Sequence, residues 1–300
     1  MSDTLLPAVG SGQRTGRAST FSRVRRLSGA RPSVRVVLAS TWIALVILAA
    51  IFAPLLPISN PDNNIGHGLL TPLFHTGAQP LGTDEFGRSV LARLIYGGRV
   101  SLAAAAASVI IAMAVGLLVG ISAGYWRGKL DTVAGILLDS ILAFPPIIVL
   151  LALAAVLQPS LRTIIIGLSL VAFPPFARLA RVATLQRVNR EFVLAARGLG
   201  ARPRTILFRE LLPAVITPAL TYATVITPVL ILAEASISFL GLGVAPPTPS
   251  WGNMIAEGYP FLQTHPQLVF VPAVFLFLTI FAFTVLGEWL RSRSDIETKL

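Results

Sequence analysis

The chain has 300 residues, of which 54% are hydrophobic and only 12% charged, and its mean hydropathy is +0.78. These values indicate an integral membrane protein, because a soluble surface of normal polarity carries about 25–35% charged residues. The net charge of +11 does not indicate a nucleic-acid binder, since the arginines stand at the ends of apolar runs. The absence of cysteine excludes disulfides, thiol catalysis and cysteine metal sites.

The first 35 residues are rich in serine, arginine and glycine, and we expect a disordered basic tail there. The apolar run that follows is too long for a signal peptide and favours a first membrane helix. A helix needs about 20 apolar residues to cross the hydrocarbon core. The sequence predicts six such spans within one membrane domain of residues 36–290: 36–56, 102–123, 133–157, 163–177 with an extension past Arg178, 211–240 and 268–286.

Six spans place both ends of the chain on one side of the membrane. Twenty of the 24 lysines and arginines fall on that side, whereas the other side has four: Arg88, Arg93, Arg99 and Arg162. The positive-inside rule therefore predicts cytoplasmic termini, with a short tail at 291–300. The external segments are then 57–100 and 241–266. In the first of them, we expect local ion pairs among Asp84, Glu85, Arg88 and Arg93.

Two carboxylates, Asp139 and Glu234, lie within predicted spans and must face protein or water instead of lipid. They either make interhelical hydrogen bonds or contact a transported cation or amine. Prolines also interrupt the spans, and each serves as a packing bend or as a hinge that lines a pathway. These prolines are Pro145, Pro146, Pro174, Pro175, Pro218, Pro228 and Pro272.

The segment 184–210 lies between two spans on the basic side and predicts a pair of short helices. Gly200 suits the left-handed end of the first helix, and Pro203 suits the first turn of the second. Such a pair either docks a cytoplasmic partner or lies on anionic lipid. Apolar residues recur at gaps of three and four, which predicts one apolar helix face: Leu185, Val188, Phe192, Ala195 and Leu199.

No catalytic constellation is found in the sequence. Gly128-Lys129 is followed by Leu130 and lacks the upstream glycine of a phosphate-binding loop. The three histidines form no His-Glu-x-x-His zinc motif, and no serine stands in a nucleophile elbow. We therefore expect no catalytic residue and no metal site.

Several motifs resemble one transporter family. Ala195-Ala196, then Gly200, then Leu212-Pro213 resembles the EAA loop of ABC importer permeases. The segments at 80–102 (PLGTDEFGRSVLARLIYGGRVSL), 139–146 (DSILAFPP) and 234–257 (EASISFLGLGVAPPTPSWGNMIAE) are similar to the C-type permease subunit of dipeptide, oligopeptide and nickel importers. The similarity is strong over 80–257 and looser in the flanking spans.

The resemblance implies the all-α, six-span fold of type I importer permeases and an ATPase-coupling role for the 184–210 helix pair. The implied coupling residues are Glu191, Ala195, Ala196, Gly200, Ala201 and Pro213. Leu194 stands where the general motif has glutamate, so the implied seat on the ATPase is apolar and shape-based. Asp139 and Glu234 become candidates for the translocation path or for interhelical contacts.

The resemblance also implies partners: a B-type permease, two ATPase domains that bind ATP and Mg²⁺, and a solute-binding protein. This chain itself is expected to bind no cofactor, and its location is the bacterial inner membrane. Contacts with the binding protein would involve Gly241, Gly243 and Trp251, although Trp251 also suits a membrane-interface anchor.

The implied cargo is a dipeptide or oligopeptide. Nickel chelates, haem, glutathione and opines are alternatives within the same family. An ion-coupled carrier or channel, or a membrane enzyme, remains as a different class of protein.

Overall fold

The computed structural model describes residues 33–64 and 80–297, which are mainly helical and contain no β-structure beyond two isolated bridges. Most of the predicted N-terminal tail (residues 1–32) and the last three residues lie outside this description. The elements are α1 (Val34–Phe52), η1 (Ala53–Leu55), α2 (Val90–Trp126), α3 (Gly128–Leu142), α4 (Pro146–Val156), α5 (Leu161–Arg187), α6 (Glu191–Gly198), α7 (Pro203–Thr205), η2 (Ile206–Leu211), α8 (Leu212–Phe239), α9 (Trp251–Gly258), η3 (Tyr259–Phe261) and α10 (Gln267–Glu297).

Five helices in the described ranges are long and apolar enough to cross a membrane, or six if one bent pair counts as a span. The predicted spans at 36–56, 211–240 and 268–286 are confirmed as α1, α8 and α10. The extension of the fourth span past Arg178 is also confirmed, because α5 continues to Arg187.

The second span begins earlier than predicted. Helix α2 starts at Val90, where the Ser89 side chain accepts a hydrogen bond from the Ala92 amide at 3.3 Å. Arg93 and Arg99 interrupt the apolar run, so hydropathy alone placed the start at 102. The last residues of the predicted external segment 57–100 are therefore helical.

The third span is not one continuous helix. Helices α3 and α4 meet at an angle of 83° across a break at residues 143–145. Pro145 and Pro146 explain the break, since a proline disfavours helical geometry in the residue before it and is itself favoured in a first turn. The prediction of a single span at 133–157 is thus corrected to a broken one.

The closest helix packing joins α2 to α5. A Cβ atom on Gly120 would lie 2.2 Å from the carbonyl oxygen of Ala177, and one on Gly124 would lie 2.9 Å from Cβ of Thr184. Gly116 faces α5 in the same way one turn earlier. Residues later in α2 contact residues later in α5, since Gly116 faces Phe176 and Gly124 faces Thr184. Helices α2 and α5 therefore run parallel. Small residues at this spacing allow membrane helices to approach backbone to backbone.

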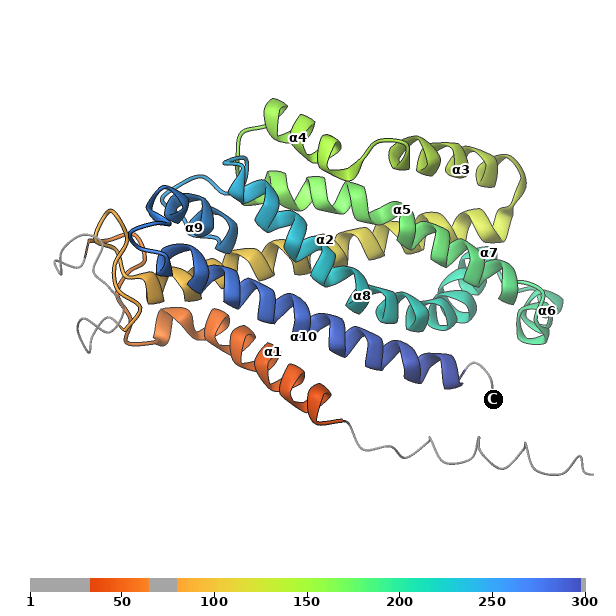
Figure 1. The fold of residues 1–300 in the computed structure, drawn as a ribbon. Helices are drawn as coiled ribbons and strands as arrows, with labels where there is room; N and C mark the ends of the chain where they lie inside the picture. The colour runs from red at the N-terminus through yellow and green to blue at the C-terminus, as the bar shows by residue number, and fades with distance from the viewer. Residues whose placement is uncertain (1–32, 65–79, 298–300) are drawn as a thin grey trace, which may run out of the picture.

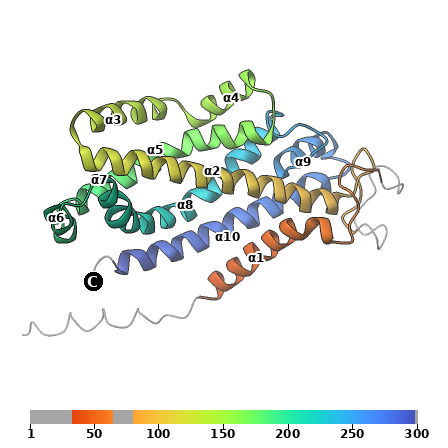
Figure 2. The same ribbon diagram turned by 180° about the vertical axis from the view of Figure 1, so that it is seen from behind.

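Figures 1 and 2 show how the elements are distributed along the bundle. Helices α6 and α7 lie at one end, and α9 lies at the other. Helix α10 ends toward the end that carries α6, and the shorter α1 runs from about the middle of the bundle toward the α9 end. Helices α3 and α4 run along the outer side of α5, whereas α1 lies beside α10 on the opposite side.

We expect Gly120→Ala to destabilise the bundle, because its new Cβ must displace the Ala177 carbonyl. Overpacking of this kind costs about 1–3 kcal/mol. The measurement is the melting temperature and membrane yield of the tagged chain. Gly135→Ala in α3 is the matched control, since nothing lies within 4 Å of that position and alanine favours a helix. Equal melting temperatures for the two variants would contradict the close α2–α5 contact.

Candidate functional site

The predicted helix pair forms the end of the bundle opposite α9 (Figure 1). Its first helix, α6, begins at Glu191, whereas Leu185 belongs to α5. Val193 is the buried residue of α6, with 0% of its surface exposed. The predicted apolar face is interrupted, because Leu185 lies on α5, whereas Phe192 and Leu199, at and after α6, are 42% and 89% exposed. The chain turns between α5 and α6, so one helical period does not continue across both.

The end of α6 has the predicted left-handed glycine. Gly200 has φ of +78°, its N–H bonds to the carbonyl of Arg197, and the Ala201 N–H bonds to the carbonyl of Ala196, both at 3.0 Å. These two hydrogen bonds together form the Schellman motif, which ends many helices. Any other residue type at position 200 would strain the backbone, because a Cβ atom is disfavoured at this φ.

Three apolar side chains are exposed on and just after α6: Phe192, Leu194 and Leu199. We call them the exposed tip. Ala195 is exposed beside them, whereas Ala196 and Ala201 are half-buried and pack against the core. An apolar group left open at the polar end of a membrane bundle is typical of a protein-binding surface.

The exposed tip is anchored to the spans. The guanidinium of Arg197 lies over the Tyr125 ring, 4.9 Å from its centroid, which ties α6 to the last turn of α2. Glu191, also exposed, stands in the first turn of α6, where a carboxylate suits the helix dipole. Pro213 lies outside the tip, in the first turn of α8 after the π-helical segment η2.

Asp139 and Glu234, predicted as candidates for one path, are not brought together. The Asp139 carboxylate of α3 pairs with Arg178 of α5, and both side chains are exposed, at 70% and 52%. A second bridge joins the same helices, from Arg181 Nη2 to Asp131 Oδ2 at 2.7 Å. These pairs hold α3 along the outer side of α5.

Glu234 is fully buried near the other end of the bundle, on α8. Its Oε1 accepts a hydrogen bond from the Ser238 hydroxyl at 2.7 Å, while Oε2 has no partner of good geometry. The hydroxyls of Ser101 and Ser250, from α2 and the start of α9, lie beside the same carboxyl group. Of the two predicted roles, this arrangement corresponds to the interhelical one.

Trp251 is buried, at 1% exposure, so the prediction of an interface anchor or an exposed contact is wrong. Its ring nitrogen donates to the Leu94 carbonyl at 3.0 Å, and its ring lies against Gly98, where a Cβ atom would come within 2.8 Å. Gly243 is also buried, against Ser238, whereas Gly241 is exposed with φ of +78°. Trp251 thus fastens α9 onto α2.

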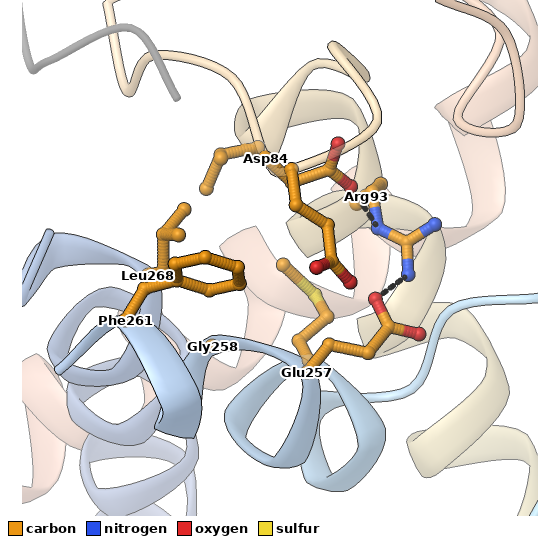
Figure 3. Close-up of a pocket in the computed structure, with 9 residues that line it drawn as sticks. Asp84, Arg93, Glu257, Gly258, Phe261 and Leu268 are labelled. Carbon is orange, nitrogen blue, oxygen red and sulfur yellow. Dashed lines mark hydrogen bonds and ion pairs between the residues drawn. The ribbon is translucent and has the colours of Figure 1, made fainter. Parts of the chain in front are cut away.

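A charge cluster joins the region before and at the start of α2 to α9: Asp84, Arg88 and Arg93 are buried, and Glu257 is half-buried. Arg93 Nη2 contacts Glu257 Oε2 at 2.7 Å, and its Nε lies 3.4 Å from Asp84 Oδ2 (Figure 3). Arg88 repeats both contacts, at 2.6 Å to Asp84 and 3.1 Å to Glu257. Local pairing of Asp84 with the arginines was predicted, but the buried position and Glu257 were missed.

Burial raises the pKa of the Glu257 carboxyl, and attraction to Arg93 and Arg88 offsets only part of this rise. The folded protein then holds this proton more tightly than the unfolded chain does. The contribution of Glu257 to stability therefore decreases as pH rises through its folded-state pKa. Removal of either arginine would leave the half-buried Glu257 carboxyl with less compensation for its lost hydration.

Comparisons with known proteins agree with this architecture. Residues 116–295 match the family described as binding-protein-dependent transport system inner membrane component. The chain is 35% identical, over 86% of each chain, to the di/tripeptide transport system permease protein DppC of Pseudomonas aeruginosa. It is 33% identical to the glutathione transport system permease protein GsiD of Pectobacterium atrosepticum, over 88% of this chain and 87% of that protein.

A solved structure has the same fold. An inward-facing structure of the MetNI methionine ABC transporter superposes with a TM-score of 0.55 at 22% identity, covering 67% of this chain and 96% of that one. The five or six candidate spans are those of a multi-pass membrane protein. The chain belongs to the family of binding-protein-dependent transport system inner membrane components.

The chain is accordingly a permease subunit of an ABC importer, a family located in the inner membrane of bacteria. Permeases of this family work with another permease, with ATPase subunits that hydrolyse ATP, and with a binding protein.

We expect Arg93→Gln to destabilise the chain strongly, because it leaves Glu257 and Asp84 to share Arg88 alone. Breaking a buried ion pair costs about 3–5 kcal/mol. The measurement is the thermal stability and yield of the purified chain. Glu85→Gln is the control, since Glu85 is a neighbouring carboxylate that makes none of the four contacts. The cluster has no structural role if Arg93→Gln is as stable as this control.

Proposed function

We propose that the chain is the C-type permease of an importer of dipeptides or short oligopeptides, and that a B-type permease completes the path. The 35% identity to a di/tripeptide permease across 86% of the chain carries this proposal. The similarity to a glutathione permease supports the same cargo class, because glutathione is itself a short peptide. Nickel chelates, haem and opines are the alternative cargoes of the same kind of complex.

We place the α6 end of the bundle in the cytoplasm, together with both tails, 1–35 and 291–300. The support is the charge distribution: with Arg178 left out because it lies within α5, nineteen of the other 23 basic residues fall on that side of the predicted spans. The α9 end, which includes the segment 241–249 before α9, then faces the binding protein. Gly241 is exposed there, whereas Trp251 and Gly243 are buried and act only through packing.

The exposed tip is the proposed seat on an ATPase subunit, which binds the ATP and Mg²⁺ that this chain does not. Phe192, Leu194 and Leu199 offer an apolar surface without a carboxylate at position 194. The Gly200 turn keeps the tip rigid, and the Arg197–Tyr125 contact transmits its displacement to α2. Alternating access requires that ATP binds one of two bundle packings better than the other.

The exposed Asp139–Arg178 pair marks the proposed path-facing side of the chain. Arg178 lies nine residues before the end of α5, about 14 Å along a helix that rises 1.5 Å per residue. Charged side chains at that depth face a protein partner or water, not lipid. The second permease or the cargo therefore covers this pair. Glu234, which is fully buried, holds α8 against α2 and α9 and does not touch cargo.

The complex is tested by affinity purification of the tagged chain from native membranes, followed by uptake in proteoliposomes. We expect a second permease, ATPases and a binding protein in fixed ratio, and ATP-dependent uptake of labelled dipeptides. Uptake that does not depend on ATP, but that a proton uncoupler abolishes, would overturn the proposal in favour of an ion-coupled carrier. Recovery of an intact complex that transports a nickel chelate or haem, but no peptide, would overturn the cargo alone.

Gly200→Val tests the coupling role. We expect uptake to be abolished at near-normal abundance, because valine cannot hold φ at +78° without strain. Gly198→Val adds the same side chain two residues earlier, where φ is ordinary and nothing lies within 4 Å of the new Cβ. Normal uptake by Gly200→Val would contradict the coupling role. Equal loss in both variants would show that bulk, and not the turn, is what the ATPase rejects.

Asp139→Asn tests the path. We expect uptake to fall about tenfold, equivalent to about 1.4 kcal/mol, because Arg178 then carries an unbalanced charge at membrane depth. The double variant Asp139→Arg with Arg178→Asp should recover most of the loss. Ser140→Ala, a change at the exposed neighbour, is the control. Unchanged uptake in Asp139→Asn would remove this pair from the proposed path.

A further inference from the structure

An open groove runs between α1 and α2, floored by α8. It has a volume of about 690 Å³ and is lined by Ile47 and Ile51 of α1, Ala106, Ile110 and Met113 of α2, and Leu220 of α8. Several of these side chains are exposed in the single chain, including Ile51 at 60% and Ile110 at 61%. We call this hollow the α1–α2 groove.

The one charged residue among the described residues that line the groove is Arg99, at its α9-side end. Arg99 and Ala103 also line a second hollow of about 720 Å³, whose other walls include Asn60, Asp62 and Tyr96. Arg99 therefore stands where an apolar groove opens into a polar one. It is exposed, and in the described part of the chain it makes no ion pair, with Asp62 or with any other carboxylate.

The length of the groove matches one leaflet of a bilayer. Arg99 and Met113 are fourteen residues apart on α2, which is about 21 Å at 1.5 Å per residue. Half of a bilayer, including its headgroups, is about 20–22 Å thick. With acyl chains against the apolar wall, a lipid headgroup would lie at the level of Arg99.

We propose that the α1–α2 groove binds one anionic glycerophospholipid, whose phosphate is held by Arg99. A guanidinium presents paired N–H donors that fit phosphate oxygens, and here it has no competing carboxylate partner. Acyl chains gain little from the groove itself, because the surrounding lipid is equally apolar. The preference for an anionic lipid over a zwitterionic one therefore comes from Arg99.

Such a lipid would also fill the gap between α1 and the rest of the bundle. Helix α1 packs mainly on α10, so the groove leaves its α2-facing side incompletely covered. A bound lipid supplies the missing contacts along that side. The retained lipid is then a structural component of the permease and is not cargo.

The test uses the intact importer, reconstituted in nanodiscs that contain phosphatidylglycerol and phosphatidylethanolamine at a ratio of about 1:4. Mild detergent then removes the loosely bound lipids. Lipids that remain bound are quantified by mass spectrometry. We expect about fivefold enrichment of phosphatidylglycerol in the wild type, the effect of one favourable charge contact. Arg99→Gln should lose the enrichment, and Arg99→Lys should keep most of it.

Arg162→Gln is the matched control. Arg162 is an exposed arginine in the first turn of α5, and it lines neither hollow. Equal retention in Arg99→Gln and Arg162→Gln, or no enrichment in the wild type, would overturn the proposal. If Arg99→Gln fails to assemble, Ala106→Phe narrows the groove away from the cation. The Ala106→Phe variant must then lose the phosphatidylglycerol enrichment. If Ala106→Phe keeps the enrichment, the proposal is overturned.

The rival occupant of the groove is a helix of the second permease. The chain lacks cysteine, so Ala106→Cys creates a single labelling site inside the groove. We expect a membrane-soluble maleimide to label it in the assembled complex. Protection in the complex, together with labelling of the isolated chain, would show that a protein covers the groove and would overturn the lipid site.

Discussion

The close contact between α2 and α5 is the constraint on which the rest of the bundle depends. In lipid, no hydrophobic force drives helices together, so association relies on backbone approach and interhelical polar contacts. Gly116, Gly120 and Gly124 permit that approach. Because the two helices are neighbours and run parallel, the chain between them must return along the outside. Helices α3 and α4 make that return, so they lie along the outer side of α5 (Figure 2).

The ion pairs described above fall into two kinds. Those at the α9 end are largely buried and mutually satisfied, with Arg93 and Arg88 shared between Asp84 and Glu257. The Asp139–Arg178 pair on the outer side of α5 is also paired, but both side chains are exposed. Burying an ion pair gives little net stability unless its geometry is good, whereas an uncovered pair cannot face lipid. The first kind holds α9 against the start of α2. The second kind marks the surface that we propose another molecule covers.

The α6 end combines a rigid turn with an apolar surface that the chain leaves open. The two backbone bonds around Gly200 and the burial of Val193 hold α6 in place, while Leu199 is almost fully exposed. The proposed seat on the ATPase requires this combination, because a displacement can pass to the spans only through a well-packed segment. The α1–α2 groove differs, because its apolar wall meets a single cation at headgroup level. Protein and lipid are thus suited to different surfaces of one subunit.

The sequence determined what local rules decide. Hydropathy located the spans, glycine chemistry identified the left-handed turn at Gly200, and the long motifs indicated the family. It could not decide contacts between distant segments. Glu257 pairs with Arg93 and Trp251 packs on Gly98 only because α9 folds back onto the start of α2. Helical periodicity likewise cannot say which face of α6 turns inward, because the neighbouring helices determine that direction, and only the tertiary structure contains them.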